Sequence, residues 1–188
     1  MPGELSAGVF IDGGYVSNLL KQHFNEAQID YGKFVTWAAS GAQLYRSYYY
    51  DCLPYHGREP SEDELIRLSR KQAFFNALNR LNRFTVRQGV LVYRGNDSDG
   101  NPILVQKRVD LQLGLDISLL VSKGYINLVV IVTGDSDMIP AVNAAKEQGV
   151  LVRLVHGPRQ TYNQELWDVV DERYEITEAV VRSMMLGR

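Results

Sequence analysis

Residues 128–140 read LVVIVTGDSDMIP, and this stretch indicates the fold class of the chain. Five aliphatic residues run directly into a polar turn, and a segment of helical period that contains Pro140 follows. An unbroken aliphatic run is typical of a strand that is covered on both faces of a parallel sheet. A second, nearly all-aliphatic run occupies residues 150–155. The order of strand, helix and strand predicts a βαβ unit near the centre of an α/β fold.

Outward from this unit, apolar runs bounded by turn residues alternate with segments of helical period along the whole chain. We expect strands at residues 8–11, 43–50, 85–93, 128–133 and 150–155. We expect helices at residues 15–24, 31–39, 61–82, 110–123, 137–148 and 163–170. The segment GNDSDGNP at 95–102 has the composition of an exposed turn. These elements predict an α/β fold around a central, mainly parallel, five-stranded sheet.

Length and cysteine content limit the organisation of the protein. A chain of 188 residues is long enough for one hydrophobic core, which predicts a single domain over residues 1–188 with its main body at about 8–171. Segment 172–188 is apolar enough to pack on this domain or on a second subunit of a homodimer. Cys52 is the only cysteine, which excludes an internal disulfide and favours a cytoplasmic setting. Without a signal pattern or a long apolar run, no membrane association is expected.

Basic side chains are concentrated in one part of the chain. Residues 65–108 contain nine of the 20 lysines and arginines but only two of the 22 acidic residues. This segment therefore carries about +7, and the rest of the chain about −9. The asymmetry is compatible with a phosphate-binding surface beside an acidic site that binds a cation. It is equally compatible with a solvated, arginine-rich helix.

Acidic residues follow two of the predicted strands. Asp12 comes after the apolar residues VFI and before two glycines, and Asp135 and Asp137 follow the aliphatic run at 128–132. In open α/β sheets, ligands bind beyond the carboxyl ends of the strands. Each of these sites can also be explained by one helix-capping aspartate. In the second site the other carboxylate would repel its neighbour unless a cation neutralises the pair, which favours a metal site.

A third acidic segment is KRVDLQLGLDISLLVSKG at 107–124. Its apolar residues lie nearly all round a helix, which is typical of a buried helix. Asp110 can be the amino-terminal cap. Asp116, however, lies on one face with Leu113 and Leu120, and a carboxylate buried there needs an ion, an arginine or a hydrogen-bond donor. We therefore expect Asp116 to belong to the acidic site.

Together, three chain segments predict a cluster of carboxylates at one edge of the sheet. The expected metal ligands are Asp12, Asp110, Asp116, Asp135 and Asp137. All-oxygen coordination suits Mg²⁺ or Mn²⁺. Because such ions activate water and neutralise a scissile phosphate, hydrolysis at this cluster would need no serine or cysteine nucleophile.

The order of the motifs FIDGGY, YYYD, KRVDLQLGLD and VTGDSDMIPAV resembles the LabA-like branch of the NYN domain family, within the PIN-like nuclease superfamily. The resemblance covers residues 9–171. It implies a three-layer α/β/α fold, PIN-like, and a Mg²⁺- or Mn²⁺-dependent ribonuclease whose partner is RNA, expected to be single-stranded. The family's acidic positions correspond to the five aspartates above, and Thr133 and Ser136 would support them. Many relatives have asparagine where this chain has Tyr15.

The first hypothesis is a ribonuclease in which Asp12, Asp116, Asp135 and Asp137 are catalytic. The basic residues expected to hold the RNA strand are Lys107, Arg108, Arg80, Arg83 and Arg94. The alternative is a non-catalytic RNA- or protein-binding regulatory module with the same fold, which Tyr15 favours. A phosphatase for a small substrate is a third hypothesis, although such enzymes usually have a second aspartate where Gly14 stands. The tyrosines at 48–50 could stack on bases, but their place in a strand favours core packing.

Overall fold

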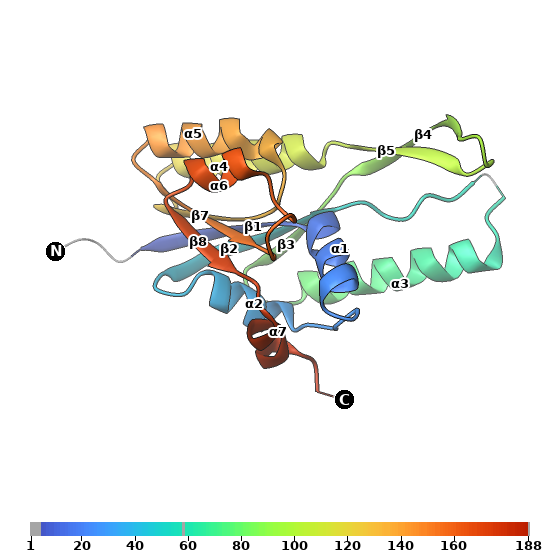
Figure 1. The fold of residues 1–188 in the computed structure, drawn as a ribbon, viewed down its shortest axis with the longest axis horizontal. Helices are drawn as coiled ribbons and strands as arrows, with labels where there is room; N and C mark the ends of the chain where they lie inside the picture. The colour runs from blue at the N-terminus through green and yellow to red at the C-terminus, as the bar shows by residue number, and fades with distance from the viewer. Residues whose placement is uncertain (1–4, 58, 188) are drawn as a thin grey trace.

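In the computed structural model, which describes residues 5–57 and 59–187, six strands form one parallel sheet (Figure 1). Their order across the sheet is β3-β2-β1-β6-β7-β8. These strands are β1 (Ser6–Asp12), β2 (Gln43–Asp51), β3 (Phe84–Gln88), β6 (Leu128–Val132), β7 (Leu151–His156) and β8 (Glu172–Glu175). A separate antiparallel hairpin pairs β4 (Val90–Asn96) with β5 (Pro102–Lys107). The predicted α/β class with a parallel central sheet is confirmed.

Helices cover both faces of the sheet (Figure 1). The helical elements are α1 (Gly13–His23), α2 (Tyr31–Ala38), α3 (Glu62–Asn79), α4 (Val109–Ser122), η1 (Ser136–Met138), α5 (Ile139–Glu147), α6 (Gln164–Val169) and α7 (Glu178–Met184). Alternate residues of β1 face opposite sides, so that Val9 and Ile11 join the core under α1, α2, α3 and α7, whereas Phe10 joins the core under α4, α5 and α6. The result is three layers, with β1 and β6 side by side at the centre.

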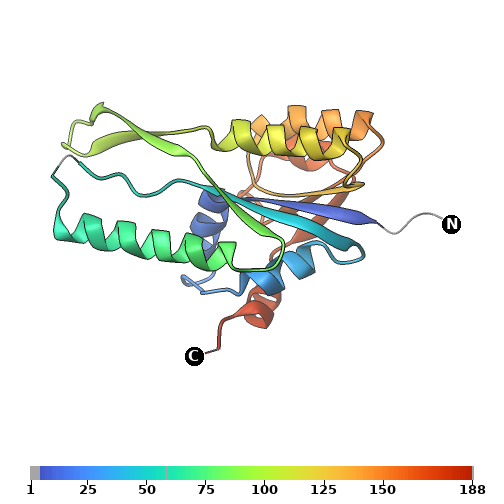
Figure 2. The same ribbon diagram turned by 180° about the vertical axis from the view of Figure 1, so that it is seen from behind.

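The expected strand at residues 85–93 is wrong, because the chain leaves the sheet at Gly89. β3 ends just before this glycine, and β4 begins just after it. A side chain at Gly89 would lie 2.5 Å from Val109 and 2.9 Å from the sulfur of Cys52, so only glycine fits where the chain crosses from the sheet to the hairpin. The polar segment at 95–102 lies at the turn between β4 and β5, and the hairpin projects beyond the sheet (Figure 2).

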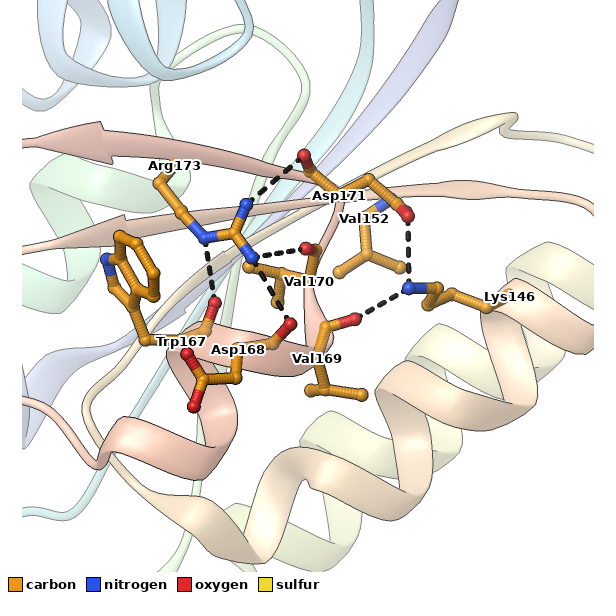
Figure 3. A network of polar contacts seen from close by, with 8 residues as sticks. All are labelled: Lys146, Val152, Trp167, Asp168, Val169, Val170, Asp171 and Arg173. Atoms are coloured by element: carbon orange, nitrogen blue, oxygen red, sulfur yellow. Dashed lines mark hydrogen bonds and ion pairs between the residues drawn. The ribbon is translucent and has the colours of Figure 1, made fainter.

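A sixth strand, β8, was missing from the sequence prediction of five. Its sequence, ERYE, has no apolar run, because it lies at the edge of the sheet. Polar contacts hold this edge to the helices (Figure 3). The guanidinium of Arg173 donates to the carbonyl oxygens of Trp167, Asp168 and Val170 at the end of α6. Lys146 of α5 donates to the carbonyl of Val169 and pairs with Asp171 at 3.0 Å.

Helix α4 is not buried all round, which corrects the expectation from its apolar sequence. Its inner face packs into the core through Val109, Leu113, Ile117 and Val121. Its outer face leaves Leu111, Leu115 and Leu119 more than half exposed. Among the described residues this stripe is uncovered, since only the inner face contacts the sheet.

The carboxy-terminal segment packs on the domain itself. Val181 and Met184 of α7 are buried in the core that contains α2, and the Met184 carbonyl accepts a hydrogen bond from the backbone of Asp30 at 2.8 Å. Within residues 5–57 and 59–187, none of the helices has the length and apolar character needed to span a membrane.

Candidate functional site

The carboxyl ends of β1 and β6 bring two motifs together. Ile11 pairs with Val132, so Asp12 and Thr133 emerge at the same edge of the sheet. The Thr133 hydroxyl donates to Asp12 Oδ2 at 3.3 Å, and its oxygen accepts from the Asp135 amide at 3.2 Å. Asp12 also caps α1 by accepting from the Tyr15 amide at 3.0 Å. Thr133 therefore links the carboxylate after β1 to the turn after β6.

The turn after β6 contains one capping aspartate and one free of that role. Asp135 caps η1 by accepting a hydrogen bond from the Asp137 amide at 2.9 Å. One cap satisfies this turn, so the second carboxylate, on Asp137, takes no part in capping. Both side chains are exposed at the carboxyl edge, and neither forms an ion pair among the described residues.

Asp110, in the first turn of α4, joins these acids electrostatically. Burial raises the pKa of Asp110 above 3.8, and the charges of Asp135 and Asp137 raise it further. Burial likewise raises the pKa of Asp12, and the charges of Asp110 and Asp51 add to this effect despite the hydrogen bonds from Tyr15 and Thr133. Neighbouring negative charges thus disfavour the ionised forms of Asp12 and Asp110, as expected for a site that stabilises its charge with a bound cation.

An open cleft of about 550 Å³ lies over three of these acids, and Asp137 is not among its lining residues. Its acidic wall consists of Asp12, Asp110 and Asp135. The other lining residues are Gly14, Tyr15, Asn18, Gln106, Gly134, Ser136, Thr161 and Asn163. Sequence reasoning identified the acids and Ser136 but missed Asn18, Gln106, Thr161 and Asn163, because polar residues in turns and strand ends carry no distinctive pattern of their own.

The donor set fits a hydrated divalent cation better than a closed metal cage. Among residues 5–57 and 59–187, no three acidic, histidine or cysteine side chains lie close enough to form a ready-made metal site. Mg²⁺ usually keeps several waters and takes only one or two carboxylates from the protein. Asp12, Asp110 and Asp135 around one cleft meet that requirement with oxygen ligands alone.

Asp116 does not line this cleft, which corrects its place in the predicted site. Its carboxylate accepts hydrogen bonds from the Tyr50 hydroxyl at 2.9 Å and from Arg87 Nε at 3.0 Å. Arg87 belongs to β3, two strands away from β1. The buried carboxylate therefore has an arginine partner and a hydroxyl donor, and it needs no metal.

Asp51 is an acid at the same edge that sequence reasoning did not include. It ends β2, next to Asp12 of β1, and it is buried. Lys71 of α3 pairs with it at 2.6 Å. The signal was an aspartate directly after three tyrosines, at the carboxyl end of a strand. Since Lys71 already neutralises it, Asp51 anchors α3 to the site edge.

Tyr15 occupies the wall of the cleft and holds a loop in place. Its hydroxyl accepts from the Gly157 amide at 2.9 Å and lies 3.2 Å from the Thr161 hydroxyl. The same loop touches the turn after β6, where the Asn163 amide donates to the Gly134 carbonyl at 2.9 Å. A side chain at Gly134 would collide with the Thr161 carbonyl and with the Tyr15 ring. Tyr15 therefore fixes the loop of residues 157–163 against the acidic edge.

The predicted basic residues divide into two groups. Lys107 and Arg108 are exposed and lie between Gln106 and Asp110, which both line the cleft. Arg94 is exposed on the hairpin strand β4.

Arg80 and Arg83 lie at the opposite edge, which corrects their assignment to the RNA site. Arg83 immediately precedes β3, and its side chain donates to the Leu44 carbonyl near the start of β2. In a parallel sheet the starts of the strands lie at the edge opposite their carboxyl ends, and α3 ends beside this opposite edge. Arg80 and Arg83 are close in sequence to other basic residues, but this closeness does not predict the edge of the sheet at which they lie.

A three-layer fold with carboxylates at the carboxyl edge of a parallel sheet defines an α/β protein of the PIN-like kind. The model of the NYN domain family matches residues 6–177, and the chain therefore belongs to this family. No curated protein gives a significant match.

Two crystal structures were compared with this fold. A protein of unknown function from Vibrio parahaemolyticus RIMD 2210633 matches over 99% of both chains, with a TM-score of 0.69 and 17% identity, which is a likeness of fold alone. MurG of Acinetobacter baumannii matches 92% of this chain and 42% of its own, with a TM-score of 0.37 and 13% identity, and this weak likeness supports no argument.

Proposed function

We propose that the protein is a divalent-metal-dependent ribonuclease that acts at the cleft described above. The observation that carries this proposal is that Asp12, Asp110 and Asp135 line one cleft and form no ion pair among the described residues, while neighbouring negative charges raise the pKa values of Asp12 and Asp110. Membership of the NYN domain family supports nuclease activity. The motif order supports the narrower assignment to the LabA-like branch, and the exposed Lys107 and Arg108 beside the cleft support RNA as the substrate.

In this proposal, one or two of the carboxylates of Asp12, Asp110 and Asp135 would bind Mg²⁺ or Mn²⁺ directly and the rest would contact its waters, and Asp137 adds negative charge beside them. When bound, the cation supplies positive charge against the scissile phosphate and lowers the pKa of the attacking water. Thr133 orients the Asp12 carboxylate through its hydrogen bond. The backbone amides of Tyr15 and Asp137 fix the Asp12 and Asp135 carboxylates. Lys107 and Arg108 would contact phosphates of the strand that enters the cleft.

The alternative is a non-catalytic RNA- or protein-binding regulatory module, and one observation favours it. The Tyr15 hydroxyl is used to hold the loop of residues 157–163, with Gly157 and Thr161 as its partners rather than Asp12. An asparagine at this position, as in many relatives, would instead be available to a phosphate.

The test is cleavage of a labelled single-stranded RNA by purified protein with Mn²⁺, with Mg²⁺ or with EDTA. We expect metal-dependent cleavage in the wild type. Asp12→Asn and Asp110→Asn should reduce the rate by about 100-fold or more, because groups that stabilise transition-state charge typically contribute that much. Asp116→Asn is the matched control. Asp116 lies on α4, as Asp110 does, but its carboxylate pairs with Arg87 outside the cleft. This variant should cleave RNA at close to the wild-type rate.

Cleavage that survives chelation would contradict the proposal, and so would equal losses in Asp12→Asn and Asp116→Asn. RNA binding without any cleavage would support the non-catalytic module. Turnover of p-nitrophenyl phosphate in the absence of RNA cleavage would support the phosphatase instead.

A further inference from the structure

One face of the β4–β5 hairpin is continuous with the acidic cleft. Side chains alternate between the two faces of the hairpin, and residues that pair across it share a face. Gln106 pairs with Leu91, and Leu104 pairs with Tyr93, so these four side chains lie on one face. Gln106 also lines the cleft beside Asp12 and Asp110. Tyr93 therefore lies one step outward from the cleft on the same face, about 7 Å along the strand.

Tyr93 forms an exposed aromatic pair at this place. Its ring stacks on that of Tyr55, with centroids 5.8 Å apart and an interplanar angle of 16°. Tyr93 remains 46% exposed although it is paired. Its hydroxyl donates to Asn96 at 2.9 Å, which fixes the ring at the outer part of β4. The tyrosines at 48–50 are buried and cannot reach a ligand, and the hydroxyl of Tyr15 in the cleft wall contacts the loop of residues 157–163.

Basic side chains lie at the margins of this face. Lys107 pairs with Val90, so its long side chain starts from the opposite face of the hairpin, whereas Arg108 lies just before α4 and Arg94 follows Tyr93 where the strand pairing shifts its register. All three are exposed, and none has an ion-pair partner among residues 5–57 and 59–187. An aromatic surface flanked by basic side chains is the combination that binds single-stranded nucleic acid, in which bases are free to stack.

We infer that the Tyr55–Tyr93 pair is a stacking platform for an unpaired base of the RNA strand whose scissile phosphate lies in the acidic cleft. This inference rests on the proposed ribonuclease function and specifies its substrate: the strand must be unpaired close to the cleaved bond. The step from Gln106 to Tyr93 is comparable to the length of one extended nucleotide. The base that stacks is therefore close to the cleaved position, and a duplex does not fit because its bases are already stacked on one another.

The experiment measures the binding of a short fluorescent single-stranded RNA by anisotropy, in an Asp12→Asn background that leaves the RNA intact. We expect Tyr93→Ala and Tyr93→Leu to weaken binding by about 5- to 100-fold, the range for one stacked base, and Tyr93→Phe to bind like the parent protein. Tyr93→Leu keeps the apolar volume of the hairpin and so guards against local unfolding. Circular dichroism melting of each variant verifies the fold.

The chain offers a matched control in a second exposed tyrosine pair. Tyr125 stacks on Tyr45 with centroids 5.7 Å apart, is 48% exposed, and precedes β6 at the opposite edge of the sheet. Tyr125→Ala should bind RNA as the parent does. A second measurement removes one base at a time from the RNA and leaves the phosphates. One abasic position should weaken binding to the parent and should not weaken binding to Tyr93→Ala any further, since the two changes remove the same contact.

Unchanged affinity in Tyr93→Ala, or a flat abasic scan, overturns the platform. A loss of the same size in Tyr125→Ala also overturns it, as does a change of oligomeric state without a change in RNA affinity, which would make this face a protein interface. If cleavage depends on metal but not on Tyr93, the stacking platform is refuted and the proposed ribonuclease function stands. If RNA binding depends on Tyr93 but the wild type does not cleave, the ribonuclease function is refuted and the platform stands. If the protein does not bind RNA, both are refuted.

Discussion

Asp12 shows how one residue combines a structural and a chemical role. Its carboxylate caps α1, accepts from Thr133 and faces the acidic cleft. A cap alone would stabilise the ionised form, and the hydrogen bonds from Tyr15 and Thr133 do lower its pKa. Burial outweighs them and leaves the pKa raised. The position is therefore better suited to a group that meets a cation than to a cap.

The raised pKa makes a prediction for Asp12→Asn in the absence of metal. Because the folded state binds the proton more tightly than the unfolded state, the wild type loses stability as pH rises from 3.8 through the raised folded pKa. In EDTA at neutral pH, the variant should therefore be more stable than the wild type, and the difference should vanish at pH values below 3.8. Urea unfolding across this pH range measures it. A wild type that is the more stable protein at neutral pH without metal would refute the prediction.

At the scale of elements, Gly89 separates the sheet from the hairpin. The chain passes here between Val109 at the start of α4 and Cys52 after β2. Sequence reasoning joined β3 and β4 into one strand, since the residues on both sides are compatible with a strand. The turn away from the sheet places Gln106 at the cleft and Tyr93 beyond it, so the extended face of the site depends on this position.

We predict that Gly89→Ala destabilises the protein by about 1–3 kcal/mol, the usual cost of forcing extra volume into a packed place. Its Cβ would lie 2.7 Å from the Lys107 carbonyl as well as against two side chains, and a backbone atom cannot move aside cheaply. Gly57→Ala, where a Cβ meets nothing within 4 Å, is the control and should change stability by less than about 0.5 kcal/mol. Guanidinium unfolding compares the two. Equal stabilities of the Gly89→Ala and Gly57→Ala variants would contradict the prediction and show that the backbone around Gly89 can shift to make room.

At the scale of the whole molecule, the basic residues lie at two opposite edges of the sheet. Lys107 ends β5 and Arg108 follows it near the acidic cleft, whereas the Arg83 side chain donates a hydrogen bond to the Leu44 carbonyl near the start of β2. A count of charge along the sequence merges these groups into one basic segment. Only the first group lies where a strand in the cleft would pass.

The salt dependence of RNA binding distinguishes the two edges. Each phosphate contact releases a counterion on binding. Lys107→Ala should therefore weaken binding and reduce the magnitude of the slope of log affinity against log salt by about 1. Arg83→Ala removes the same charge from the opposite edge and should leave the slope unchanged. Anisotropy titrations at several salt concentrations measure both slopes. Equal changes in the two variants would mean that RNA spans both edges.

The sequence by itself determined the fold class and the central acidic edge of this protein. Strands β1 and β6 are encoded by local apolar runs, and an aspartate directly after such a run lies at a strand end wherever the strand packs. For that reason the places of Asp12, Thr133, Asp135 and Asp137 could be predicted from residues that are close together in the chain. Asp110 followed from its position at the start of a helix.

Only the tertiary structure decided which distant charges meet. Asp116 is paired with Arg87, 29 residues away, because β3 lies beside β2 in the sheet and α4 packs against both strands. Lys71 reaches Asp51 for a similar reason. The periodicity of apolar residues predicts which residues are buried and whether a segment is a helix or a strand, since both depend on residues that are close together in the chain. Which charged residues form an ion pair depends on the strand order and on the face of the sheet that each helix covers. Neither can be predicted from the local sequence pattern.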